Sequence, residues 1–133
     1  MKKLVVAAMI VSAMIAGCSK GSTEESTEKT PTLTDKLIGT KWTAIDDIAE
    51  LIYGRTCTTS IEFLTETKCQ QINIRKTNFL PGTFIEEGTW RTKGDSLYFT
   101  IKTLTIGGVV SGSVLLTDMK TISGGKRNYT KDY

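Results

Sequence analysis

The stretch that decides the fold occupies residues 83–102 and reads TFIEEGTWRTKGDSLYFTIK. Apolar and polar side chains alternate along both of its halves, as they do in β-strands that bury one face. The residues that share the predicted inner face are Phe84, Glu86, Gly88, Trp90, Leu97, Phe99 and Ile101. Between the two halves, Lys93-Gly94-Asp95 is a turn sequence. The stretch therefore predicts an antiparallel β-hairpin.

Similar short strands are predicted on both sides of this hairpin. They cover residues 38–45, 56–64, 68–76, 103–106, 109–111, 112–120 and 126–133, and the turns between them include Gly107-Gly108. Strands at a spacing of roughly ten residues, separated by turn signals, are typical of antiparallel meanders and barrels. We therefore predict an all-β fold, an up-and-down meander of about eight strands that closes into a small barrel.

One segment, residues 47–53, changes period and predicts a short helix. Its aliphatic residues recur at positions i, i+3 and i+4, and these are Ile48, Leu51 and Ile52. Asp47 and Glu50 fit a capping box at its start, and Gly54 suits a left-handed stop. Because two helical turns are too few to be stable alone, we expect the apolar face to pack on the barrel.

The amino-terminal segment has the character of a secretory signal peptide, predicted over residues 1–17. Lys2 and Lys3 precede an apolar run at residues 4–16 that ends in small residues. Thirteen residues at about 1.5 Å each span roughly 20 Å, which is shorter than a hydrocarbon core of roughly 30 Å. A permanent membrane-spanning helix is therefore the weaker interpretation.

The end of this run, Ile15-Ala16-Gly17-Cys18, resembles the lipobox of bacterial lipoproteins. In that family the cysteine thiol receives a diacylglycerol, the chain is cut just before it, and the new amino terminus is acylated, for example with palmitate. The resemblance implies that Cys18 is a lipid attachment site. The alternative is a plain cleaved signal followed by an incidental cysteine.

Residues 18–36 are predicted to be the lipidated cysteine and a flexible Ser/Thr/Glu tether. Residues 19–32 contain no aromatic or aliphatic side chain, so they cannot bury enough apolar surface to offset their ordering entropy. Residues 37–133 remain for one folded domain. Without residues 1–17, the 17 basic residues fall to 15 against 14 acidic ones. That balance gives no reason to expect nucleic acid as a partner.

Three short elements of the predicted domain carry a second resemblance. They are Leu37-Ile38-Gly39-Thr40-Lys41-Trp42, Ser60-Ile61-Glu62-Phe63 and the run from Gly88 to Leu97. Their order and spacing behind a lipobox resemble the lipocalin-like domains of small Bacteroidetes lipoproteins, over most of residues 37–133. The resemblance implies an up-and-down β-barrel in the cell envelope, anchored by lipid, and we expect the outer membrane.

Cys57 and Cys69 leave two alternatives open. An oxidising compartment favours a disulfide between them. A tight hairpin at Thr65–Thr67, however, would place Cys57 opposite Ile74 or Arg75. Cys69 would then lie about five residues, roughly 16 Å, along the neighbouring strand, which is beyond disulfide reach. The second alternative is one buried thiol and one partly exposed thiol.

The sequence offers little for catalysis. It contains no histidine, which excludes nucleophiles activated by histidine and the usual zinc sites. Glu86 and Glu87 are adjacent on a predicted strand, so their carboxylates point to opposite faces. We therefore predict that the protein is not an enzyme and has no metal and no cofactor.

Two functional hypotheses remain. In the first, the barrel mouth binds a small apolar or glycan-like ligand against aromatic side chains, namely Trp42, Phe63, Phe84, Trp90 and Tyr98. The competing explanation is that these aromatics fill the core. In the second, the protein contacts another envelope protein through its barrel surface and has no ligand cavity. A cavity of several hundred cubic ångströms would favour the ligand, whereas an exposed apolar patch would favour the protein partner.

Overall fold

The computed structural model describes residues 29–54, 56–76 and 80–133 of the chain. The chain divides into two units, Met1–Thr30 and Pro31–Tyr133, and the second unit is the barrel. The predicted signal peptide, the lipobox, Cys18 and most of the tether lie outside the described residues. None of the helices in the described ranges is long and apolar enough to cross a membrane.

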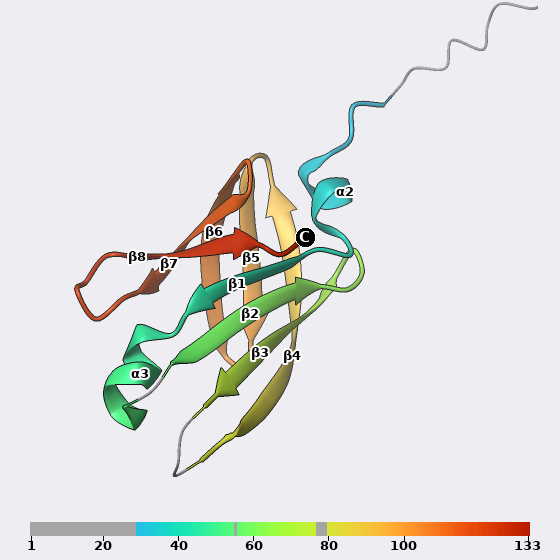
Figure 1. Ribbon diagram of the computed structural model, residues 1–133. Helices are drawn as coiled ribbons and strands as arrows, with labels where there is room; N and C mark the ends of the chain where they lie inside the picture. The colour runs from blue at the N-terminus through green and yellow to red at the C-terminus, as the bar shows by residue number, and fades with distance from the viewer. Residues whose placement is uncertain (1–28, 55, 77–79) are drawn as a thin grey trace, which may run out of the picture. The chain divides into compact units, whose positions relative to one another are not determined.

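Eight antiparallel strands form a closed barrel, in which each strand pairs with its neighbour in sequence and β8 pairs with β1 (Figure 1). The strands are β1 (Lys41–Ile45), β2 (Cys57–Phe63), β3 (Lys68–Arg75), β4 (Gly82–Lys93), β5 (Ser96–Ile101), β6 (Leu104–Ser111), β7 (Val114–Lys120) and β8 (Lys126–Lys131). This architecture confirms the predicted up-and-down meander.

The core follows the predicted alternation of side chains. In β1, Trp42 and Ala44 are buried while Lys41, Thr43 and Ile45 are not. The buried cluster continues around the barrel with Ile61, Phe63, Cys69, Trp90, Leu97, Phe99, Ile101, Ile106, Leu115 and Tyr129. Period-two alternation with one apolar face is what a closed sheet around a filled interior requires.

The prediction of a turn at Gly107-Gly108 is wrong, because both glycines lie inside β6. A Cβ atom on Gly108 would lie 2.9 Å from Cδ1 of Leu115, and one on Gly107 would lie 2.6 Å from Oδ2 of Asp118. Glycine here allows close approach to β7 and does not make a bend. The adjacent hairpin turns at Gly112, where φ is +59°.

A five-residue helix, α2 (Leu33–Leu37), overlaps the end of the segment predicted to be tether, residues 18–36. Thr32 and Asp35 form its capping box, and Leu37 is fully buried in the core. The hydroxyl groups of Thr34 and Thr92 are 2.7 Å apart, which ties α2 to β4. The compact unit thus begins at Pro31, before the boundary predicted at residue 37.

Helix α3 (Asp47–Tyr53) covers the predicted residues, at the end of the barrel opposite α2 (Figure 1). Its N-cap is Asp46 instead of the predicted Asp47, and Gly54 ends it with φ of +70°. The expectation that its aliphatic face packs on the barrel is wrong. Of its side chains only Ala49 is buried, whereas Leu51 is 72% exposed. The barrel side of the helix start instead holds carboxylates, which pair with a buried arginine.

Cys57 and Cys69 are free, so the disulfide that the sequence left open is not formed. Cys57 pairs with Arg75, as the hairpin argument predicted, and Cys69 pairs with Phe63 at the far end of β2. Both thiols are buried, each with 1% exposure, so the expectation of one partly exposed thiol is also wrong. The two pairing positions on β2, Cys57 and Phe63, are six residue steps apart, roughly 20 Å of strand.

Candidate functional site

Three of the five aromatic residues predicted to bind a ligand belong to the core. Trp42, Phe63 and Trp90 are at most 4% exposed, and the rings of Phe63 and Trp90 pack with centroids 4.7 Å apart. The Trp42 indole N–H donates to the Thr40 hydroxyl at 2.8 Å, and the Trp90 indole donates to the Thr65 carbonyl at 2.7 Å. These side chains fill the interior, and both indole N–H groups are hydrogen-bonded there.

The other two aromatic residues lie on different faces of the barrel. Tyr98 pairs with Arg91 across β4 and β5, on the outer face, and the Arg91 guanidinium lies 4.9 Å from its ring centroid. Phe84 lies towards the α3 end and is 39% exposed. The Arg75 guanidinium lies 4.7 Å from the ring centroids of both Phe84 and Tyr53. The five residues therefore do not form one site.

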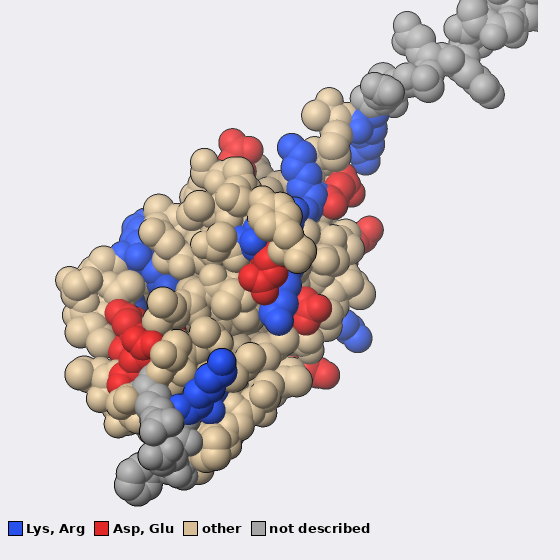
Figure 2. Space-filling model, viewed as in Figure 1, with Lys and Arg blue, Asp and Glu red and all other residues tan. Residues whose placement is uncertain are grey.

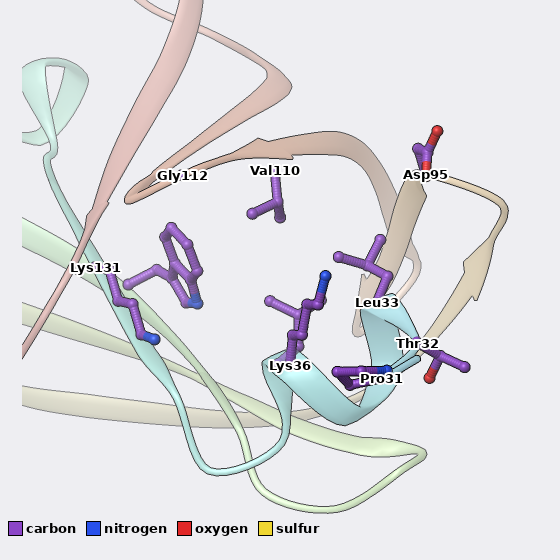
Figure 3. A pocket seen from close by; sticks show the side chains of 10 residues that line it. Pro31, Thr32, Leu33, Lys36, Asp95, Val110, Gly112 and Lys131 are labelled. Atoms are coloured by element: carbon purple, nitrogen blue, oxygen red, sulfur yellow. The ribbon is translucent and has the colours of Figure 1, made fainter. Parts of the chain in front are cut away.

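A cleft of about 690 Å³ lies beside α2, at the end of the barrel that this helix covers (Figure 3). We call it the α2 cleft. Its apolar lining comes from Leu33, Leu37, Trp42 and Val110, and charged lining residues are Lys36, Lys131 and Asp95. The volume lies within the range of roughly 300–1,000 Å³ that is usual for small-molecule sites.

Two structural elements build the apolar side of the α2 cleft. Leu33 and Leu37 are four residues apart on α2, so they lie on one face of the helix. Val110 lies on the inner face of β6, where it pairs with Leu115 and packs against the core. Of these lining residues only Trp42 was predicted. The sequence signal that could have revealed α2 was the pattern Thr32-x-x-Asp35, because it is a capping sequence at a helix start.

The α3 end of the barrel is held by an ion-pair network. The Arg127 side chain is 5% exposed, and its Nη2 lies 3.2 Å from Oδ1 of Asp46 and 2.9 Å from Oδ1 of Asp47. The Ile122 backbone N–H donates to Oδ2 of Asp47 at 2.7 Å. That hydrogen bond, followed by the charge and hydrogen bond of Arg127, holds the pKa of Asp47 below its ordinary value. The network fixes the start of α3 to β8.

A group of exposed aliphatic side chains surrounds this helix. We call it the α3 patch, and it consists of Ile45, Ile48, Leu51, Ile52 and Ile122, with exposed fractions between 42% and 72%. Ile122 is adjacent to the helix start, because its backbone N–H binds Asp47. Exposed aliphatic groups that gather in one region are typical of interaction surfaces.

Charged side chains of both signs are interspersed on the face of the molecule shown in Figure 2. Neither sign forms a continuous field on that face. In the described ranges, no three His, Cys, Asp or Glu side chains are grouped as a metal ion would require. No family model, curated protein or solved structure matches the chain.

Proposed function

We propose that the protein is a lipid-anchored lipoprotein of the cell envelope whose barrel domain binds a small ligand with an apolar body in the α2 cleft. The observation that carries the ligand proposal is the cleft itself, about 690 Å³ with an aliphatic side next to the core. The anchoring proposal rests on the lipobox-like sequence that ends at Cys18 and on the likeness to small envelope lipoproteins.

The lining favours an apolar ligand over a glycan-like one. Sugar recognition usually relies on an aromatic ring with a free face. Trp42 is 2% exposed, so its ring offers no such face. Leu33 and Val110 are half-buried at the cleft and present aliphatic groups instead. Covering them would contribute through the hydrophobic effect, at roughly 25 cal/mol per Å² of apolar surface removed from water.

Two adjacent valines provide a matched test of the α2 cleft. Val110→Phe adds volume on the cleft side of β6, whereas Val109→Phe adds the same volume on the outer side, where Val109 is 50% exposed. The probe is N-phenyl-1-naphthylamine, a neutral apolar dye, titrated into the purified full chain and followed by fluorescence. We expect Val110→Phe to reduce dye binding and Val109→Phe to leave it unchanged. Equal binding by both variants, or no binding by the parent chain, contradicts the proposal.

The anchor has its own test. A Cys18→Ser chain should lose incorporation of labelled palmitate and should leave the membrane fraction. A Cys69→Ser chain is the matched control, because Cys69 is buried in the barrel and lies far along the chain from the lipobox. Palmitate labelling that survives Cys18→Ser contradicts the anchor.

The α3 patch favours a second candidate function, contact with another envelope protein. Leu51 and Ile52 are 72% and 67% exposed on a helix whose start is fixed by Arg127. A rigid aliphatic surface loses little conformational entropy on binding. A photo-crosslinking residue placed at Leu51 should therefore capture a protein in intact cells.

The control position for crosslinking is Ile85, an aliphatic residue on β4 that is 59% exposed. A genuine partner should crosslink at position 51 but not at 85, and Ile48→Lys should abolish the product. Crosslinks at both positions, or a product insensitive to Ile48→Lys, contradict the second function. A product with twice the mass of the chain would identify the partner as a second copy, and it would contradict contact with a different protein.

A further inference from the structure

Two ammonium groups at the α2 cleft make no ion pair with any acidic side chain that the structure describes. Lys36 belongs to the last turn of α2, and Lys131 is the last residue of β8. Neither makes an ion pair within the described part of the chain, where the paired cations are Lys102, Lys126 and Arg127. In the view of Figure 3, the Lys36 side chain lies between Lys131 and Leu33, and Asp95 lies beyond Leu33. The cleft thus combines an aliphatic side with positive charge.

The position of Lys131 follows from closure of the barrel. Lys131 pairs with Trp42 across β1 and β8, on the inner-facing side of both strands. Its side chain is half-buried, whereas Lys36 is exposed. Each lysine side chain contributes a positive charge. Two like charges beside an apolar surface attract an anion, and an attached apolar chain would cover the aliphatic groups at the same time.

We infer that the α2 cleft selects a single-chain amphiphile with an acidic headgroup, whose carboxylate or phosphate binds Lys36 and Lys131 while its chain covers Leu33 and Val110. This inference rests on the proposed ligand function and adds the headgroup. A cleft of about 690 Å³ is of the size of ordinary small-molecule sites and suits one chain better than a two-chain phospholipid. Charge complementarity with the two lysines favours an acidic headgroup over a neutral one.

The experiment compares two probes that share an eight-carbon chain, octanoate and octyl glucoside, each kept below its micelle concentration. The purified full chain is titrated by NMR, and the Trp42 indole N–H and the Val110 amide report on the cleft. We expect octanoate to bind more tightly, and added salt to weaken octanoate alone. Lys36→Gln and Lys131→Gln should each weaken octanoate about two- to fivefold and leave octyl glucoside unchanged.

Lys120→Gln is the control for charge, because Lys120 is an exposed residue of β7 that does not line the cleft. It should leave the affinity for both probes unchanged. Equal affinity for the two probes overturns the inference while the proposed ligand function stands. An octanoate affinity that neither Lys36→Gln nor Lys131→Gln changes has the same meaning. Binding of neither probe overturns the ligand function itself. Tighter binding of dihexanoylphosphatidylglycerol than of octanoate assigns the cleft to a membrane phospholipid and overturns the single-chain ligand.

Discussion

Replacing Asp47 with alanine tests how α3 is fastened to the barrel. The change removes the acceptor of three hydrogen bonds, from the Ile122 N–H at 2.7 Å, from Arg127 Nη2 at 2.9 Å and from the Ile48 N–H at 3.1 Å. Hydrogen bonds to charged groups contribute roughly 1.5–3 kcal/mol each when they are buried. Asp47 is 31% exposed and Arg127 keeps Asp46, so we expect a total loss of about 2 kcal/mol.

Urea denaturation of the purified chain, followed by tryptophan fluorescence, measures this loss. For a domain of this size, 2 kcal/mol corresponds to a fall in Tm of about 10 °C. Asp118→Ala is the matched control, because Asp118 pairs with Lys126 at 3.0 Å while both side chains are more than half exposed. Exposed pairs contribute at most about 1 kcal/mol. Equal losses for the two variants would refute the role given to the Arg127 network.

The difference in stability between the parent chain and Asp47→Ala should depend on pH. The Ile122 hydrogen bond and then Arg127 lower the pKa of Asp47 below its ordinary value of 3.8 in the folded state. A carboxyl group with a lowered folded pKa stabilises the fold fully above its unfolded pKa and loses this contribution as the pH falls through the folded pKa. The difference in unfolding free energy between the parent chain and Asp47→Ala should therefore be constant near neutrality and shrink below about pH 4. A difference that stays constant into acid contradicts the assignment.

Three further predictions concern the barrel. Trp42→Ala should cost about 3–5 kcal/mol in urea denaturation because the ring is 2% exposed, whereas Leu51→Ala, at 72% exposure, should stay within about 0.5 kcal/mol of the parent. Burial raises the pKa of the Cys69 thiol to about 11, so its alkylation by iodoacetamide at pH 8 should be slow in the native chain and fast in urea. Gly88→Ala should cost about 1–3 kcal/mol by the same assay, because its methyl group would overlap the Thr100 carbonyl oxygen.

The barrel could be predicted because each strand carries its own signal. The alternation around Trp90 and the turn at Gly94 depend only on neighbouring residues, and β4 and β5 formed where those patterns indicated. The outward face of α3 could not be predicted in the same way. Ile48, Leu51 and Ile52 have the spacing of a buried helix face. Long-range contacts hold the helix in another orientation, among them those of Arg127 with Asp46 and of Arg75 with Tyr53.

The α2 cleft could not be predicted from the sequence, although the fold could. Lys36 and Lys131 lie near opposite ends of the folded unit's sequence. They line one cleft because β8 closes on β1. Neither lysine stands in a motif, since an exposed lysine at a helix end is ordinary. The ligand hypothesis was based on aromatic residues, and a small barrel uses most of these to pack its core.

The positions of the two candidate surfaces make both functions compatible. Helices α2 and α3 lie at opposite ends of the barrel (Figure 1), so the α2 cleft and the α3 patch do not share an end. The buried cluster that includes Phe63, Trp90 and Phe99 fills the interior. The barrel unit begins at Pro31, which lines the α2 cleft. Because no described side chain contributes to both surfaces, changes at one end should add independently to changes at the other.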